Sequence, residues 1–153
     1  MSARRVTFVI PGNGVSGNHY KQPMASKVHG GRQYVTSKAA TFKSAVYGIA
    51  FQACEEARFE LPEYVRVDVS VCNMRYDRDN AVKVLYDAMQ GVCYRHDSRI
   101  LDGAIRIVRD RLEPRYIVTV VEIGKDALPR YRQGRLRNDP PPISHEEWVA
   151  GLT

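Results

Sequence analysis

The chain has 153 residues, of which 44% are hydrophobic and 26% are charged, and these values predict a single globular domain with its own core. No apolar run is long enough to span a membrane, and the apolar run over 6–10 is too short for a signal peptide. Three cysteines, Cys54, Cys72 and Cys93, form no close pair in the sequence. They favour a reduced, cytoplasmic protein over a disulfide framework or a zinc site.

Charge is distributed unevenly along the chain. The net charge is +6, and residues 1–54 contain no Asp or Glu. The basic residues of this half are Arg4, Arg5, Lys21, Lys27, Arg32, Lys38 and Lys43. The first part of the chain carries only positive charge, and the carboxylates follow in the second part. This distribution predicts that the first part holds a polyanion on which the second part acts. A basic surface that serves only solubility is the alternative.

The first elements are a strand over 5–10 and a long glycine-rich loop over 11–36. Residues 12–17 spell G-x-G-x-x-G, but no amphipathic helix follows and no acid lies about twenty residues on, so a dinucleotide site is rejected. Basic and aromatic residues alternate in the rest of the loop, which favours a nucleic-acid contact. A surface loop that binds nothing remains the alternative.

Two helices and three more strands follow. Ser37 is the expected N-cap of a helix over 38–58. Its apolar stripe comprises Phe42, Ala45, Val46, Ile49, Ala50 and Ala53. Alternation from Val65 predicts a half-buried strand, and further strands are expected over 104–111 and 116–123. The predicted fold is a small mixed α/β domain over 1–123, with the order β-α-β-α-β-β and a mixed sheet. A basic, proline-rich tail over 124–153 follows, with a short helix started by Ser144 and Glu147.

Residues 75–83, RYDRDNAVK, join the strand from Val65 to the second helix. That helix carries an apolar stripe of Ala81, Val84, Leu85, Ala88, Met89 and Val92, and Gly91 is expected to end its regular part. If the strand geometry continues, Asp77 and Asp79 point to one side, and Asp79 or Asn80 caps the helix. Lys83 lies one turn after Asp79. A cap explains one acid, whereas a second acid beside it suggests a bound cation.

Asp97 is a third acid, placed before a later strand. A loop cap or an ion pair with Arg95 or Arg99 is its simplest role. Three carboxylates would also suit a hard divalent cation, because Mg²⁺ prefers oxygen ligands and keeps several waters. Such an ion lowers the pKa of bound water and neutralises charge on phosphate. Lys83 would supply a further positive charge.

At these residues the chain resembles the RusA-type endonucleases, which resolve Holliday junctions. The resemblance rests on the D-x-D-N-x-x-K core over 77–83, on residues 86–89, and on Asp97 before a strand. Pro11, Asn18 and Tyr20 resemble the family's opening. Arg78 and His96 depart from the family pattern, in which an apolar residue and an acid are common at these places.

The resemblance implies a homodimer that makes paired nicks in branched DNA, in a bacterial or phage-infected cell. It also implies Mg²⁺ or Mn²⁺ held by Asp77, Asp79 and Asp97, with Lys83 as the catalytic lysine. We expect the backbone of the DNA to be contacted by Asn18, Lys21, Lys27, Arg32 and Arg75. Three alternatives stay open: a junction-binding module without nuclease activity, a metal nuclease acting on other branched or single-stranded nucleic acid, and a structural protein in which Asp79 is only a cap.

Overall fold

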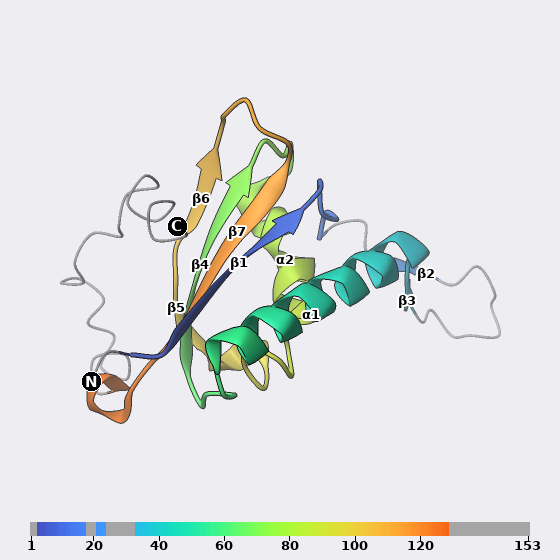
Figure 1. Cartoon of the computed structure of the whole chain (residues 1–153). Helices are drawn as coiled ribbons and strands as arrows, with labels where there is room; N and C mark the ends of the chain where they lie inside the picture. Colours follow the sequence, from blue (N-terminus) through green and yellow to red (C-terminus); the bar gives the residue numbers. More distant parts are fainter. Residues whose placement is uncertain (1–2, 18–20, 24–32, 129–153) are drawn as a thin grey trace.

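A five-stranded mixed sheet forms the centre of the computed structural model, which describes residues 3–17, 21–23 and 33–128 (Figure 1). The strands follow the order β1-β7-β4-β5, and β6 also pairs with β4. Strands β1 (Arg5–Pro11), β7 (Arg115–Glu122) and β4 (Val65–Cys72) are antiparallel neighbours. Strands β5 (Ile100–Asp102) and β6 (Ile105–Val108) run parallel to β4. The mixed sheet confirms the predicted fold class.

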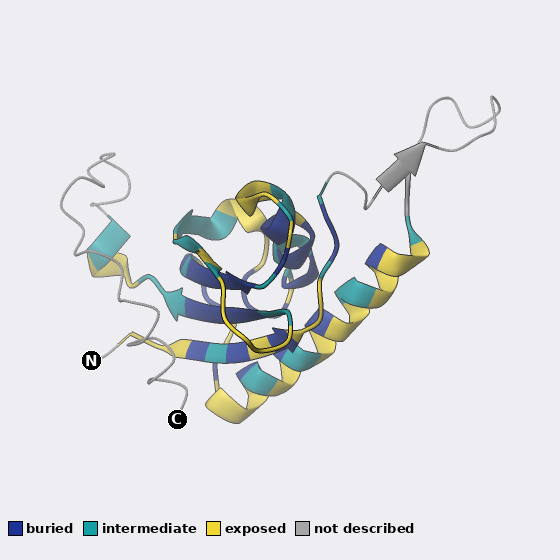
Figure 2. Ribbon diagram, turned by 90° about the horizontal axis from the view of Figure 1, so that it is seen from above, coloured by how far each residue is buried: buried dark blue, intermediate teal, exposed yellow. Residues whose placement is uncertain are grey.

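Helices α1 (Ser37–Ala57) and α2 (Arg78–Ala88) pack on one face of the sheet. Val46 and Ala50 of α1 and Leu85 of α2 share a core with the alternate valines of β4. Figure 2 shows the buried and half-buried residues of α1 turned toward the sheet and the exposed ones turned outward. Within the described residues, neither helix is long and apolar enough to cross a membrane.

Strand β4 is buried on both faces, so the expectation of a half-buried strand was wrong. Its polar side has Asp68 and Ser70, and both are buried along with Cys72. Cys72 and Ile117 form a second cluster with Val108 on this side. Asp68 is tolerated there because it is paired with Arg66 at 3.0 Å and accepts a hydrogen bond from the Ala104 amide at 2.8 Å.

Several predicted boundaries also need correction. The loop expected over 11–36 contains a short hairpin of β2 (Lys21–Pro23) and β3 (Gln33–Val35). The N-cap of α1 is Thr36, which accepts a hydrogen bond from the Ala39 amide, and the predicted stripe residue Ala45 is exposed. The strand expected over 104–111 ends at Val108, because the following residues form the β6–β7 turn, and β5 precedes it as a separate strand. Helix α2 ends at Ala88, before Gly91.

The register places three connections at the same end of the sheet. Cys72 lies opposite both Arg115 and Val108, and Arg115 lies opposite Pro11. The β1 loop (12–17), the β4–α2 turn (73–77) and the β6–β7 turn (109–114) therefore leave the sheet side by side, at the upper end in Figure 1. In open sheets, the carboxyl ends of parallel strands are the usual place for a ligand site.

Candidate active site

Asp77 occupies the N-cap position of α2, but its side chain makes no capping hydrogen bond. The backbone of Asp77 is extended, and the helix begins at the next residue, Arg78. The predicted cap, Asp79 or Asn80, is therefore wrong: Asp79 lies in the first turn, where a negative charge stabilises the helix dipole. Asp77 and Asp79 are both exposed. The two carboxylates thus stand at the helix N-terminus without the capping bond that would explain Asp77.

Three side chains tie the turn that carries Asp77 to β6 and to the β6–β7 turn. Asn73, which has a positive φ of 59°, donates from Nδ2 to the Asp110 carboxylate at 2.6 Å and to the Leu112 carbonyl at 2.8 Å. Arg109 donates to the Met74 carbonyl at 2.6 Å, and Arg78 donates to the Ile105 carbonyl at 2.5 Å. Sequence reasoning missed the roles of Asn73 and Arg109, because these contacts join residues more than 30 positions apart.

The β1 loop packs against the first turns of α2. Gly12 donates its amide to the Pro114 carbonyl at 2.9 Å, and Gly17 donates to the Asn80 carbonyl at 2.7 Å. A Cβ on Gly17 would lie 3.1 Å from Cβ and Cδ of Lys83. The glycines therefore allow the loop to approach Lys83 closely. The loop leads to β2 and not to a helix, which agrees with rejecting a dinucleotide fingerprint.

Asp97 belongs to a different element from the other two acids. It begins the short 3₁₀ helix η2 (Asp97–Arg99), and its side chain is 47% exposed. Its ion-pair partner is Nδ1 of His96 at 2.8 Å, whereas the described residues show no pair with Arg95 or Arg99. His96 also caps η2 by accepting from the Ser98 amide.

Tyr94 is buried, and Tyr86 of α2 is half-buried and packs against the same core. The Tyr94 hydroxyl donates to the Tyr86 carbonyl at 2.7 Å. Burial raises the pKa of Tyr86 to about 12, with smaller contributions from Asp68 and Asp79. Burial also raises the pKa of Tyr94, and the charge of Asp97 adds to this shift. Both phenols are therefore neutral at ordinary pH, and sequence reasoning had assigned no part to Asp68 of β4, whose charge acts on Tyr86.

The described residues contain no group of three or more His, Cys, Asp or Glu side chains arranged to hold a metal ion. Asp77 and Asp79 are nonetheless of the oxygen-donor type that Mg²⁺ takes, and such an ion is commonly held by one or two carboxylates, waters and substrate phosphates. The metal role of Asp77, Asp79 and Asp97 remains a prediction. Among the predicted DNA contacts, Arg75 is exposed in the β4–α2 turn.

The side chains of the other four predicted DNA contacts are not described by the structure. Asn18, Lys27 and Arg32 lie outside the described residues, and only the backbone of Lys21 is described, in β2. The predicted helix near Ser144 also lies outside them, as does most of the tail. The assignment of these residues to DNA contact stays a prediction.

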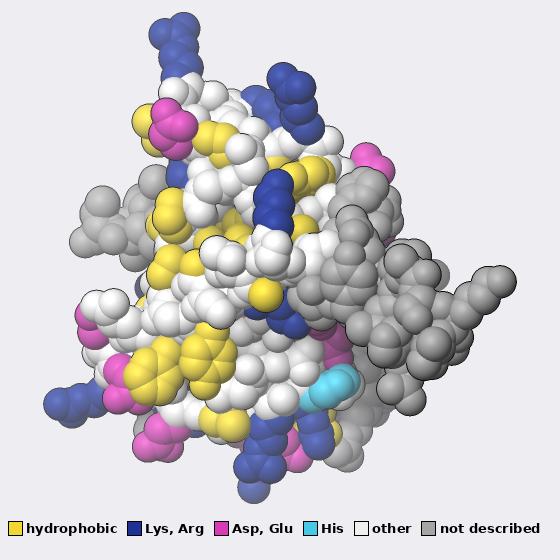
Figure 3. Space-filling view, turned by 90° about the vertical axis from the view of Figure 1, so that its right-hand side faces the viewer, with side chains coloured by type: hydrophobic (Ala, Val, Ile, Leu, Met, Phe, Trp, Pro, Cys, Tyr) yellow, Lys and Arg dark blue, Asp and Glu magenta, His cyan; other side chains and the backbone are white. Residues whose placement is uncertain are grey.

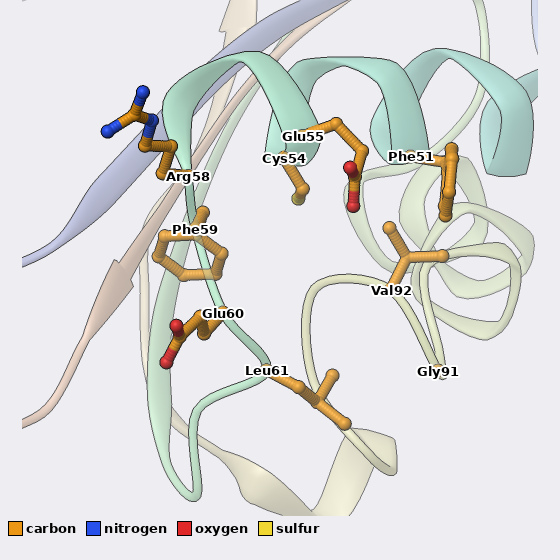
Figure 4. Close-up of a pocket in the computed structure, with 9 residues that line it drawn as sticks. All are labelled: Phe51, Cys54, Glu55, Arg58, Phe59, Glu60, Leu61, Gly91 and Val92. Carbon is orange, nitrogen blue, oxygen red and sulfur yellow. The ribbon is translucent and has the colours of Figure 1, made fainter.

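A pocket of about 500 Å³ lies between the end of α1 and residues 91–92 (Figure 4). Its lining is Phe51, Cys54, Glu55, Arg58, Phe59, Glu60, Leu61, Gly91 and Val92, which includes none of the predicted site residues. Cys54 and Cys93 are free thiols whose sulfurs lie 3.9 Å apart, a proximity that their spacing in the sequence does not indicate. Cys72 is also a free, buried thiol.

A family model described as Endodeoxyribonuclease RusA matches residues 17–121. The chain belongs to the RusA family. A comparison with curated proteins finds no match. The family match spans the β4–α2 turn, α2, Lys83 and Asp97, so it covers every residue of the predicted catalytic set. As a RusA family member, the protein is an endodeoxyribonuclease of the kind that resolves Holliday junctions.

Proposed function

We propose that this RusA protein cleaves four-way DNA junctions by a reaction that depends on Mg²⁺ or Mn²⁺ and makes paired nicks in opposite strands. The observation that carries the proposal is the Asp77 carboxylate, which stands exposed at the N-cap of α2 without capping it. Asp77 and Asp79 both stand at the start of α2, where two like charges repel each other unless a cation offsets them, and a purely structural cap needs only one acid. Their chemistry fits a hard divalent cation.

Asp77 and Asp79 would hold the metal together with water and a substrate phosphate, and Asp97 is the proposed third ligand. When bound, a divalent cation supplies a water of lowered pKa and neutralises charge on the phosphate. Asn73, Arg78 and Arg109 position the two acids, because their hydrogen bonds fix the β4–α2 turn against β6 and the β6–β7 turn. A preset turn does not have to be ordered when the metal and the DNA bind.

Lys83 supplies a positive charge to the same phosphate or to the leaving oxygen. It follows Asp79 by one helical turn and lies against Gly17, so its stem is confined by the β1 loop. Loss of its charge should lower the rate of cleavage more than the affinity for DNA, because the charge acts where negative charge develops in the transition state.

The protein should act as a homodimer on a junction. A two-fold dimer presents one active site to each of two opposite strands, which suits a substrate with nearly two-fold symmetry. DNA affinity should fall steeply with salt and depend little on sequence, because the predicted contacts of Lys21, Lys27, Arg32, Asn18 and Arg75 are with the backbone. The division into a domain over 1–123 and a tail over 124–153 is part of the same proposal.

A supercoiled plasmid that extrudes a cruciform separates paired from single nicks. Paired nicks in one binding event yield linear plasmid, whereas independent nicks yield nicked circles first. We expect linear product with Mg²⁺ or Mn²⁺, none with EDTA, and none from a plasmid lacking the cruciform. Light scattering of the free protein should give the mass of a dimer. Junction binding without cleavage in either metal would contradict the proposal and favour a binding module.

A further inference from the structure

Leu112 is the most exposed of the large hydrophobic side chains in the described residues, at 65%. It lies in the β6–β7 turn, at the end of the sheet from which the β4–α2 turn also leaves. Single exposed hydrophobic residues are common on protein surfaces, so exposure alone assigns no role. The hydrogen bonds that hold the β6–β7 turn are the second observation that bears on the role of Leu112.

Hydrogen bonds fix the backbone of Leu112 on both sides. Its amide donates to the Asp110 carboxylate at 3.0 Å, and its carbonyl accepts from Nδ2 of Asn73 at 2.8 Å. Asp110 is held in turn by Arg115 at 2.7 Å and by its own amide, which donates to Oδ1 of Asn73 at 3.0 Å. The turn is therefore held in place, and it presents an apolar side chain that is mostly exposed within the described chain.

The surroundings of Leu112 suit a nucleic acid. Arg111 precedes it and is exposed, and exposed Arg75 lies in the neighbouring β4–α2 turn. Figure 3 shows Lys and Arg side chains that stand out at the upper end of the molecule, next to hydrophobic ones. Asn73 contacts the Leu112 carbonyl and precedes Asp77 by four residues. The Cα atoms of Asn73 and Asp77 can therefore be at most about 15 Å apart.

We propose that Leu112 inserts between base pairs at the branch point of the junction, while Arg111 and Arg75 contact the flanking phosphates. Proteins that unstack DNA use apolar wedges of this kind beside basic residues. The branch point is the favourable place for insertion, because base stacking is already interrupted between the arms. This inference rests on the proposed function, since it gives the same site a means of selecting junctions over duplex.

Fluorescence of 2-aminopurine placed beside the branch point tests the inference without cleavage. The fluorescence of this base rises when it is unstacked, and EDTA in the buffer chelates divalent metal, so the junction stays uncleaved during the measurement. We expect wild-type protein to raise the signal on a junction and not on linear duplex. Leu112→Ala should lose most of the fluorescence rise. Its affinity for the junction should change by less than about tenfold, because the free energy gained by inserting the leucine is offset by the cost of unstacking the bases.

Two further variants separate the wedge from general damage. Leu112→Met should restore most of the fluorescence rise, because an apolar side chain of similar size is again presented. Leu61→Ala removes another exposed leucine, 41% exposed and lining the pocket at the end of α1, and should behave as wild type. The inference is overturned if wild type gives no rise, or if Leu112→Ala unstacks the base as well as wild type.

The same variants distinguish failure of the wedge from failure of the nuclease assignment. If wild type cleaves the cruciform plasmid but unstacking does not depend on Leu112, only the wedge is wrong. If unstacking depends on Leu112 but no metal supports cleavage, the wedge stands and the proposed nuclease chemistry is wrong.

Discussion

Gly14→Ala tests whether the β1 loop is fixed against the end of the sheet. Gly14 has a positive φ of 67°, and a Cβ there would overlap the hydroxyl oxygen of Tyr116. The left-handed backbone costs a residue with a Cβ about 1–2 kcal/mol. The tyrosine must also move, which breaks its 2.6 Å hydrogen bond to the Ala81 carbonyl and leaves a buried hydroxyl unpaired. That loss costs about 1–3 kcal/mol.

Together these terms predict that Gly14→Ala lowers the free energy of unfolding by about 2–5 kcal/mol. Thermal unfolding followed by circular dichroism should show a fall in Tm of about 5–15 °C for a chain of this size. Gly12→Ala is the matched control, because Gly12 also has a positive φ but a Cβ there would meet no atom within 4 Å. Equal losses for the two variants would refute the packing of Gly14 against Tyr116.

Three other predictions concern Gly48 in α1, the Cys54–Cys93 pair and the Asp110–Arg115 pair. Gly48→Ala, inside α1 with open space around the added Cβ, should raise the free energy of unfolding by about 0.5–1 kcal/mol in urea denaturation; an unchanged midpoint would count against it. Iodoacetamide should modify Cys54 before Cys93. The hydrogen bond from Cys93 lowers the pKa of Cys54, whereas the same bond and burial raise the pKa of Cys93. Equal rates of modification in peptide mapping would contradict this prediction. Arg115 holds the pKa of Asp110 below its ordinary value, so this pair stabilises the protein above about pH 4 and the stabilisation is lost as pH falls further. Asp110→Asn should remove that part of the acid dependence in urea midpoints measured from pH 5 to 3.

The longer elements could be predicted because their periodic patterns coincide with burial. The stripe of α2 is buried throughout, and the alternate valines of β4 face the helices. Strands β2, β3 and β5 have three residues each, which is too short for a period to be recognised. The burial of the second face of β4 was not predictable from alternation, because the polar residue Asp68 is paired with Arg66 and Ala104, and the latter is far away in the sequence.

The candidate site was predictable in its residue types and not in its geometry. Asp77, Asp79 and Asn80 are all good N-caps, so the sequence could not decide where the backbone turns from extended to helical. The hydrogen bonds of Asn73 and Arg109 depend on the pairing of β4 with β6, which no local pattern shows. The glycines of the β1 loop were recognised, but the close packing of Gly14 against Tyr116 and of Gly17 against Lys83 was not predicted.

The role of Asp77 is tested most directly by Asp77→Asn, with stability, junction binding and cleavage measured on the same preparation. Asn is as good an N-cap as Asp, and Asp77 makes no capping bond, so the free energy of unfolding should change by less than about 1 kcal/mol. Asp126→Asn, in the short helix η3 (Lys125–Ala127), is the control for loss of a carboxylate elsewhere.

We predict that Asp77→Asn keeps its Tm and its affinity for a synthetic four-way junction. Its rate of cleavage in both Mg²⁺ and Mn²⁺ should fall by a factor of about 100 or more, which corresponds to a loss of about 3 kcal/mol of transition-state stabilisation. Cleavage by Asp77→Asn at the wild-type rate, with unchanged metal dependence, would contradict the account and return Asp77 to a structural position at the start of α2.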